Sequence, residues 1–444
     1  MNIIIIGGVA AGMSAAAKIR RLKRDWTIRV YEKTGYPSLG ACGLPYFIGG
    51  FTNDPEVLIA RTLSKIIEDG IDMRTGHEVT GIDPSNKQVT VKHIDTGETF
   101  TDHYDKLLIA SGVSPVIPPF ENASLENIHT VKSYDDGIIL KSKLSSSNIK
   151  ETVIIGAGFI GLEMAEALKH RGKNVRVIQL DKRVLPDTFD GEISEIIEKE
   201  LVSQNIALHT GERVLGFSGS CGVEKVITDK GTYPADLVII AAGVKPNTAF
   251  LGNTGLELLS NGAVKTDNQC RTNIEDIYAA GDCAAVYHMT AGTHMNIPLG
   301  GLANKAGRTA GDVICGGSAK LDIVLGSAAV KVLDIEAGRT GITEQEALKY
   351  QIPCKSVYIS DKDHPASFPG QENIHVKLVY SVPDGRFLGG QVAGKQGAVL
   401  RTDVLAAAIA GGLTVRQLGI LDLCYSPPFS KPWDALNIAG YVAD

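Results

Sequence analysis

The chain has 444 residues, which corresponds to two to four domains of about 100–200 residues each. Apolar residues make up 44% and charged residues 21% of it, ordinary values for a globular protein that buries a core. The net charge of −6 gives no general attraction to nucleic acid or anionic membranes, and no apolar run reaches the roughly 18–20 residues that span a bilayer. We therefore expect a cytoplasmic protein with neither a nucleic acid nor a membrane as partner.

The seven cysteines argue against a disulfide framework. They are Cys42, Cys221, Cys270, Cys283, Cys315, Cys354 and Cys424. Their number is odd and no two form a C-x-x-C pair, so neither structural disulfides nor a zinc site is expected. The histidines lack the spacing that a helical metal site needs, so we expect no metal. Six of the cysteines are interpreted as small buried residues.

The chain opens with a strand–turn–helix–strand unit of about 30 residues. An apolar strand at 2–6 is followed by the turn Gly7–Gly12, a helix over 13–24 and a strand at 27–31 that ends at Glu32. A full G-x-G-x-x-G motif would carry glycine at position 9, where this chain has valine. Glycines let the backbone approach a pyrophosphate, and Glu32 is placed to accept hydrogen bonds from ribose hydroxyls. The alternative is a tight turn without a ligand.

A second unit repeats the pattern with a complete motif. A strand at 152–155 leads to Gly156, Gly158 and Gly161, then to a helix over 162–172 and a strand at 175–180. The acid that would hold a ribose hydroxyl is replaced by Gln179, followed closely by Lys182 and Arg183, either of which could pair with a 2′-phosphate. Two such units predict two nucleotide sites in parallel-sheet domains, with NADH and NADPH both open.

Three further stretches complete the pattern. The segment 272–282 is a strand that ends in Gly281-Asp282, a carboxylate aimed at a ligand hydroxyl or, alternatively, a helix cap. The stretches 104–118 and 235–249 resemble each other, each being an apolar strand followed by a small-Gly turn and a proline, and we interpret them as crossings between domains. After about residue 322 the pattern becomes that of an α+β module.

Together these motifs resemble the pyridine nucleotide–disulfide oxidoreductase family over essentially the whole chain. The resemblance implies an α/β fold with two Rossmann-like domains, for FAD (1–115 and 245–322) and NAD(P)H (116–244), and a C-terminal α+β dimerisation domain (323–444). It implies FAD contacts from Gly7, Gly8, Ala11, Gly12, Glu32, Ser38, Ser111, Gly112, Gly281, Asp282 and Ala303. It implies nicotinamide-nucleotide contacts from Gly156, Gly158, Phe159, Ile160, Gly161, Glu163, Gln179 and Gly243. The stretch 302–308 resembles the helix whose N-terminus faces the flavin.

The surroundings of Cys42 resemble the single-cysteine branch of that family. The chain reads S-x-x-x-C-G-x-P-Y over 38–46, without the second cysteine of a C-x-x-x-x-C pair. With one thiol, the resemblance implies that electrons pass from NAD(P)H through flavin to whatever Cys42 is joined to, so the oxidant is external. A cysteine at a helix N-terminus near flavin is expected to have a lowered pKa.

The members of this branch differ at a few positions. Oxidases and peroxidases carry a histidine in the first glycine turn, where this chain has Ala10. The stretch 421–434 resembles coenzyme A disulfide reductases, in which a tyrosine matching Tyr425 reaches the partner subunit's sulfur, and this implies a homodimer; the alternative is an interface residue. A paired tyrosine of those reductases is absent, because Ser367 and Phe368 occupy its place. Persulfide or polysulfide therefore stays open as the substrate.

Two arginines are predicted to bind the phosphates of a coenzyme A substrate. Coenzyme A carries several phosphates, and Arg61, in a stretch that resembles the reductases, and Arg20, in a basic run at the end of the first helix, are the candidates to pair with them. For the basic run, a solvated helix face is the alternative.

The sequence thus predicts an FAD-dependent NAD(P)H oxidoreductase that reduces coenzyme A disulfide or a related small disulfide or persulfide through Cys42 and Tyr425. Its alternatives are an NADH oxidase and a per/polysulfide reductase. A hypothesis of another class is a flavoprotein electron carrier or redox sensor whose output is a protein partner.

Overall fold

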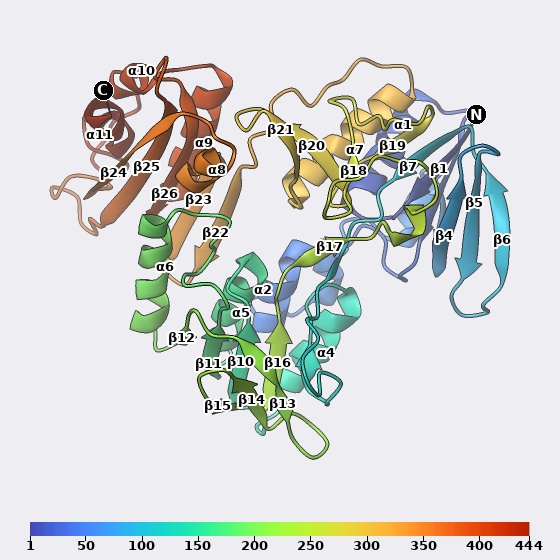
Figure 1. Cartoon of the computed structure of the whole chain (residues 1–444), viewed down its shortest axis with the longest axis horizontal. Helices are drawn as coiled ribbons and strands as arrows, with labels where there is room; N and C mark the ends of the chain where they lie inside the picture. The colour runs from blue at the N-terminus through green and yellow to red at the C-terminus, as the bar shows by residue number, and fades with distance from the viewer. Residues whose placement is uncertain (444) are drawn as a thin grey trace.

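Buried apolar segments build the first parallel sheet of the computed structural model, which describes residues 1–443. Its strand order is β19 (Ile277–Ala279), β7 (Lys106–Ile109), β1 (Asn2–Ile6), β2 (Thr27–Glu32) and β3 (Asp72–Thr75). The central strand β1 has parallel neighbours on both sides, which explains its continuous run of isoleucines. Helices α1 (Ala10–Leu22) and α7 (Gly300–Ile314) pack against each other in this lobe, blue and yellow in Figure 1.

A second parallel sheet lies in the green lobe of Figure 1. Its order is β12 (Ala207–His209), β11 (Asn174–Ile178), β10 (Glu151–Ile155), β16 (Leu237–Ile240) and β9 (Ile128–His129). Helices α4 (Tyr134–Leu144), α5 (Phe159–His170) and α6 (Gly191–Ser203) belong to the same lobe. The two crossings of the chain meet as an antiparallel pair, β8 (Val113–Pro115) with β17 (Val244–Pro246).

Three small sheets, two antiparallel and one mixed, accompany the two parallel ones. They are β4 (His77–Asp83), β5 (Gln88–His93) and β6 (Thr99–His103); β13 (Val214–Ser218), β14 (Lys225–Thr228) and β15 (Thr232–Pro234); and β20 (Ala284–His288) with β21 (Thr293–Asn296) antiparallel and β18 (Val264–Lys265) parallel to β20. Short helices are η1 (Ala41–Gly43), α2 (Leu44–Gly49), η2 (Pro55–Leu58), α3 (Leu63–Glu68) and η3 (Ala249–Leu251).

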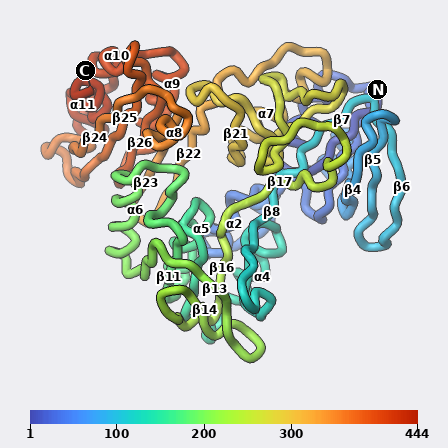
Figure 2. Tube along the Cα trace, in the orientation of Figure 1, coloured from blue at the N-terminus to red at the C-terminus, as the bar shows by residue number. Residues whose placement is uncertain are grey.

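The C-terminal lobe is an antiparallel sheet with helices. Its strand order is β22 (Ala328–Val332), β23 (Ile335–Gly341), β26 (Phe387–Gly394), β25 (Asn373–Ser381) and β24 (Cys354–Lys362). Its helices are α8 (Glu344–Lys349), α9 (Ala398–Ala410), α10 (Val415–Gly419) and α11 (Ala435–Val442). The trace in Figure 2 leaves the blue lobe for the green one, returns in yellow to the first lobe and ends in this orange-red lobe. The predicted fold class is confirmed.

Element boundaries differ from the predictions by two or three residues. The first helix begins at Ala10 and ends at Leu22, and α5 begins at Phe159, three residues before the predicted start. The strand β11 ends at Ile178 and not at residue 180. Both helices begin inside the glycine turns, because those turns already wind into the first helical turn.

One apolar core joins the three lobes around α2. It combines Leu44, Phe47 and Ile48 of α2 with residues of α5 and with Val330 and Val332 of β22. The α2 helix therefore holds the residues just before it at the junction of the lobes.

Candidate functional site

The first glycine turn is closed too tightly for side chains at two positions. Gly7 has φ +102°, and a Cβ atom on it would lie 2.2 Å from the carbonyl oxygen of Ala110. A Cβ atom on Gly12 would lie 1.9 Å from the carbonyl oxygen of Gly7. The backbone N–H of Gly8 donates to Oε2 of Glu32 at 2.7 Å. These contacts hold the strand, the turn and α1 together, so Glu32 sits at the edge of the turn.

The second glycine turn has the same geometry. Gly156 has φ +104°, and a Cβ atom there would lie 2.3 Å from the carbonyl oxygen of Ala241. A Cβ atom on Gly161 would lie 2.0 Å from the carbonyl oxygen of Gly156, whereas one on Gly158 would meet nothing within 4 Å. The space beside Gly158 is therefore open for a ligand, as a pyrophosphate-binding turn requires.

Several helices begin without a side-chain cap, including α2, α6 and α9, which do not follow the predicted glycine turns. The helices α1, α5 and α7 have no side-chain cap, whereas Ser133 and Thr343 cap α4 and α8 through capping boxes. Uncapped N-terminal N–H groups and the positive end of the helix dipole attract anions. The helices that the sequence assigns to bound nucleotides thus keep their N-terminal N–H groups free of side-chain caps.

Residues predicted for FAD meet around the first turn. Ser38 has φ +56°, its N–H donates to the carbonyl oxygen of Gly8 at 2.8 Å, and its buried Oγ has no hydrogen-bond partner among the residues described. A Cβ atom on Gly281 would lie 2.8 Å from that of Ala11 and 3.7 Å from that of Ala303. An unpartnered buried hydroxyl beside a crowded glycine turn fits a bound dinucleotide.

The predicted residues at the two crossings lie beside the β8–β17 pair. Ser111 donates its hydroxyl to the carbonyl oxygen of Asn247 at 2.7 Å, so this side chain joins the two crossings. Gly112 and Gly243 have φ of +67° and +106°, and a Cβ atom on either would meet nothing within 4 Å.

Cys42 lies in η1, immediately before α2. The residue is exposed, but its thiol is partly desolvated by its neighbours, and its Sγ lies 3.6 Å from the position of a Cβ on Gly300, the first residue of α7. The core contacts of Leu44 and Phe47 fix α2, so they also fix the thiol at the start of α7. Two segments more than 250 residues apart in the printed sequence thus meet at this sulfur.

Burial raises the pKa of the Cys42 thiol, and the nearby carboxylates of Glu163 and Asp282 raise it further. Lys132 opposes this shift. The expectation of a lowered pKa is therefore wrong for the protein's own side chains, because the carboxylates and burial outweigh the one lysine. Burial also raises the pKa of Asp282 itself, again against Lys132.

Glu163, whose charge acts on Cys42, lies on α5. Burial raises the pKa of Glu163 to about 7, with a further contribution from Glu166. Oε1 of Glu166 forms an ion pair with Nζ of Lys331 of β22 at 3.0 Å. The buried Oε2 of Glu166 has no hydrogen-bond partner in residues 1–443. Glu163, Tyr46 and Lys331 line a hollow of about 410 Å³ between α5 and the C-terminal lobe. Phe159 and Ile160 of the same helix pack against the three-lobe core.

Three predicted residues do not join this cluster within the chain. Tyr425 is 51% exposed and makes no hydrogen bond or ring contact with any residue of 1–443. Arg61 forms an ion pair with Asp69. Arg20 donates to the carbonyl oxygens of Arg24, at 2.8 Å, and Gly70. The substrate-binding roles of the two arginines stay predictions, and both guanidinium groups are engaged within the chain.

Three neighbours of the sulfur were not predicted as such from the sequence: Lys132, Tyr46 and Gly300. Tyr46 stood in the quoted Cys42 motif without a role, and burial followed by Glu163 raises its pKa. Gly300 precedes the recognised 302–308 stretch by two residues. Lys132 stands in no motif, so only the fold brings it near Cys42.

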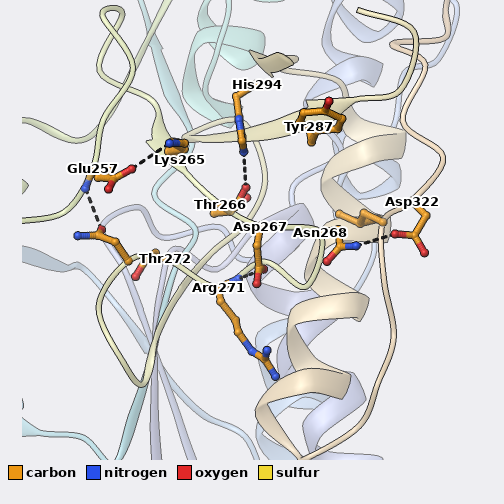
Figure 3. Close-up of a pocket in the computed structure, with 12 residues that line it drawn as sticks. Glu257, Lys265, Thr266, Asp267, Asn268, Arg271, Thr272, Tyr287, His294 and Asp322 are labelled. Carbon is orange, nitrogen blue, oxygen red and sulfur yellow. Dashed lines mark hydrogen bonds and ion pairs between the residues drawn. The ribbon is translucent and has the colours of Figure 1, made fainter. Parts of the chain in front are cut away.

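A second hollow, of about 660 Å³, lies on the first lobe between the segments 257–273, 287–294 and 321–322 (Figure 3). Several of its polar groups are paired with one another: Lys265 with Glu257 at 3.0 Å, His294 with the carbonyl oxygen of Thr266 at 3.0 Å, and Asn268 with Asp322 at 2.6 Å. It contains none of the predicted site residues.

The described residues offer neither a metal site nor a membrane-spanning helix. Among residues 1–443 no group of three or more His, Cys, Asp or Glu side chains is placed to hold a metal ion. The same part of the chain contains no helix with the length and apolarity that crossing a membrane requires.

Two protein-family models together match nearly the whole chain. Residues 1–307 match the pyridine nucleotide-disulphide oxidoreductase model, and residues 327–436 match the dimerisation domain of the same group.

Individual relatives cover the chain end to end. It is 38% identical to the NAD(P)H sulfur oxidoreductase (CoA-dependent) of Pyrococcus furiosus, over 99% of this chain and 98% of that one. It is 33% identical to the NADH oxidase of Methanocaldococcus jannaschii, over 99% and 98%. It is 29% identical to the coenzyme A disulfide reductase of Staphylococcus aureus, over 100% and 99%.

Among solved structures, the NAD-dependent persulfide reductase of A. fulgidus superposes with a TM-score of 0.95 at 35% identity. The match covers all of this chain and 83% of the other.

Proposed function

Given that the chain belongs to the pyridine nucleotide-disulphide oxidoreductase family, we propose that it reduces coenzyme A disulfide or a related small disulfide or persulfide, with Cys42 as the reacting sulfur. It is an FAD-dependent NAD(P)H oxidoreductase of that family. The relatives named for coenzyme A disulfide and for CoA-dependent sulfur reduction support this choice of substrate.

The proposed cofactor sites follow the two glycine turns. FAD would lie along Gly7, Gly12, Glu32, Ser38 and Asp282, and NAD(P)H along Gly156–Gly161, Glu163 and Gln179. The proposed domain bounds, 1–115 with 245–322, 116–244 and 323–444, separate the sheets, although the cut at 244/245 passes through β17. A bound FAD supplies the two-electron path from the nicotinamide to sulfur.

The chemistry proposed for Cys42 is a thiol–disulfide exchange. Its thiolate attacks one sulfur of the disulfide, so a Cys42–S–S–R bond forms while the first product leaves as RS⁻ and takes up a proton. Two electrons from NAD(P)H then cleave this bond, which releases the second RS⁻ and restores the Cys42 thiolate. The sum is RSSR + NAD(P)H + H⁺ giving two RSH and NAD(P)⁺.

The position of Cys42 is the observation that carries this proposal. Cys42 is an exposed residue, its sulfur lies at the start of α7, and the charges of two carboxyl groups, Glu163 and Asp282, act on it. All seven cysteines are free, so an external sulfur compound is the natural partner of this thiol. Free thiols throughout also support the proposal that the protein works in the cytoplasm.

An oxidase is the second candidate, because NADH oxidases are among the relatives. Ala10 argues against it. This residue begins α1 and offers no acid–base group to a sulfenic acid at Cys42.

The dimer completes the proposed site. The family's dimerisation domain matches 327–436, so the protein acts as a homodimer, and Tyr425 lies within that domain. We assign Tyr425 to the sulfur of the partner subunit, where its hydroxyl would donate a proton or hydrogen bond to the leaving thiolate.

The proposal is tested with Cys42→Ser, using Cys221→Ser, another exposed cysteine, as control. Reduction of coenzyme A disulfide by NADH should be abolished in Cys42→Ser, while reduction of the bound flavin by NADH persists. Cys221→Ser should keep both. Undiminished disulfide turnover in Cys42→Ser would contradict the proposal and favour an electron carrier for a protein partner.

A further inference from the structure

The end of β11 differs from the matching end of β2 in where it carries its negative charge. Oε2 of Glu32 accepts from the N–H of Gly8, and Oε1 accepts from the N–H and the hydroxyl of Thr34, both at 2.8 Å. Gln179 takes the place of Glu32, because its Oε1 accepts from the N–H of Ala157 at 2.7 Å. An uncharged amide therefore closes the second turn.

Asp181 supplies the missing carboxylate two residues later, at the position that matches Thr34. Its Oδ2 accepts a hydrogen bond from the amide nitrogen of Gln179 at 2.8 Å. The bond that Thr34 donates to Glu32 in the first unit is thus kept with donor and acceptor exchanged. Gln179 is buried and Asp181 is exposed, so the hydrogen bond holds an exposed carboxylate just after the end of β11.

Two lysines, Lys182 and Lys230, lie near Gly211, whose backbone hydrogen-bonds to that of Asp181. The N–H of Gly211 donates to the carbonyl oxygen of Asp181 at 2.7 Å. A Cβ atom on Gly211 would lie 3.8 Å from Cγ of Lys182 and 3.9 Å from Nζ of Lys230. Both lysines are exposed, so their ammonium groups can turn toward an anion beside Asp181.

Arg183, which the sequence offered as a phosphate partner, is committed elsewhere. Its guanidinium donates to the carbonyl oxygen of Pro186 at 2.9 Å and to Gln345 of α8. Farther along, the carboxylate of Asp190 accepts from the N–H of Glu344 at 3.0 Å and from the amide of Gln391 at 2.6 Å. The segment 181–190 is therefore bound to the C-terminal lobe, and this limits how far Asp181 can move.

We propose that Asp181, positioned by Gln179, makes the second nucleotide site select NADH over NADPH. This inference rests on the proposed function, in which that site binds the pyridine nucleotide. A ribose 2′-hydroxyl can donate to the free Oδ1 of Asp181, whereas a 2′-phosphate would place like charges side by side. Because Lys182 and Lys230 attract the 2′-phosphate, the preference for NADH over NADPH depends on the carboxylate of Asp181.

The test uses Asp181→Asn, which keeps an oxygen acceptor for Gln179 and removes the charge. The probes are ADP-ribose and its 2′-phosphorylated form, whose binding to the FAD-loaded enzyme is followed by calorimetry. Wild type should bind ADP-ribose more tightly, and Asp181→Asn should move the ratio of the two affinities toward the phosphorylated probe by about tenfold or more. Adding Lys230→Ala should remove part of that gain.

Asp187→Asn is the matched control, because Asp187 is an exposed aspartate in the same segment. It should leave the ratio unchanged. An unmoved ratio in Asp181→Asn, or an equal shift in Asp187→Asn, would overturn this inference while both probes still bind. If wild type binds neither probe and neither nucleotide reduces the flavin, the proposed function itself fails, and the inference fails with it.

Discussion

At the scale of single residues, Glu163 and Cys42 are coupled through charge. The carboxylate of Glu163 raises the pKa of Cys42, second only to burial, and the pKa of Glu163 itself is about 7. Near neutral pH the carboxyl group of Glu163 therefore changes between its charged and neutral forms. When it is protonated, its negative charge no longer opposes ionisation of the Cys42 thiol, so the thiolate is favoured. The two groups therefore titrate as a coupled pair.

Glu163→Gln should make the Cys42 thiol more acidic. A neutral side chain removes the negative charge that opposes ionisation of the thiol, so the pKa of Cys42 falls and its thiolate forms at lower pH. The check is the pH dependence of Cys42 alkylation by iodoacetamide in the reduced enzyme. The rise in rate should move to lower pH than in wild type.

Glu336→Gln is the control for this shift. Glu336 lines the same hollow as Glu163 but is not among the charges that raise the pKa of Cys42. Its alkylation profile should match wild type. A profile of Glu163→Gln that stays in place, or that moves to higher pH, would show that the carboxylate does not act on the thiol.

At the scale of elements, the crossing of α1 and α7 positions two uncapped helix N-termini. A Cβ atom on Gly307 would lie 2.1 Å from the carbonyl oxygen of Ala11, so the helices touch backbone to backbone. Because α1 begins at the first glycine turn and α7 begins beside Cys42, this contact sets the spacing between the proposed FAD turn and the sulfur.

Gly307→Ala should therefore weaken both folding and cofactor binding. The helices must separate to admit a methyl group, and overpacking of this kind destabilises by about 1–3 kcal/mol. We expect a lower Tm and less FAD per protomer than in wild type. Gly191→Ala, at the exposed start of α6 where a Cβ atom would meet nothing within 4 Å, should leave both unchanged. Equal FAD content in the two variants would contradict the role of the crossing.

Much of this arrangement follows from sequence pattern. The turns Gly7–Gly12 and Gly156–Gly161 were recognisable because strand, turn and helix are contiguous there and glycine is sterically required. Helix starts were placed about three residues late at Ala10 and Phe159, since residues of the turn already adopt helical geometry.

Contacts between distant segments were not predictable in this way. Nothing local to Lys132 indicates that it lies near Cys42, and nothing local to Asp190 indicates that it binds the first turn of α8. Arg20 stands in a basic run, but its guanidinium is used within the chain. For the protein's side chains alone, the pKa of Cys42 is raised, first by burial and then by Glu163 and Asp282, which opposes the lowering expected from a helix N-terminus and a bound flavin.

At the scale of the whole molecule, the second and third lobes are joined by a buried network. Lys377 of β25 is almost fully buried and contacts Glu192 and Glu344 at 2.8 Å, one from each lobe. Burying a cation is tolerable only when carboxylates surround it in this way. The network therefore holds the nucleotide lobe against the dimerisation lobe within one protomer.

Mixed dimers test whether Tyr425 serves the partner's sulfur. Cys42→Ser alone should be inactive toward disulfide, and Tyr425→Phe alone should be slower by about 10²-fold or more, as loss of an acid–base group implies. A dimer with one protomer of each kind contains one intact pairing of Cys42 with a partner tyrosine. Tagged mixed dimers should therefore recover about half of the wild-type rate per dimer. If Tyr425 acted on its own chain, no intact pairing would form and activity would stay at the level of the single variants.

The most direct test of Cys42 as the electron outlet is an anaerobic titration with NADH after exposure to coenzyme A disulfide, followed by intact mass. We predict that wild type carries a coenzyme A adduct on Cys42, consumes one NADH more per flavin than Cys42→Ser, and loses the adduct as it does so. Equal NADH consumption by both proteins, with no adduct on Cys42, would contradict the single-sulfur mechanism.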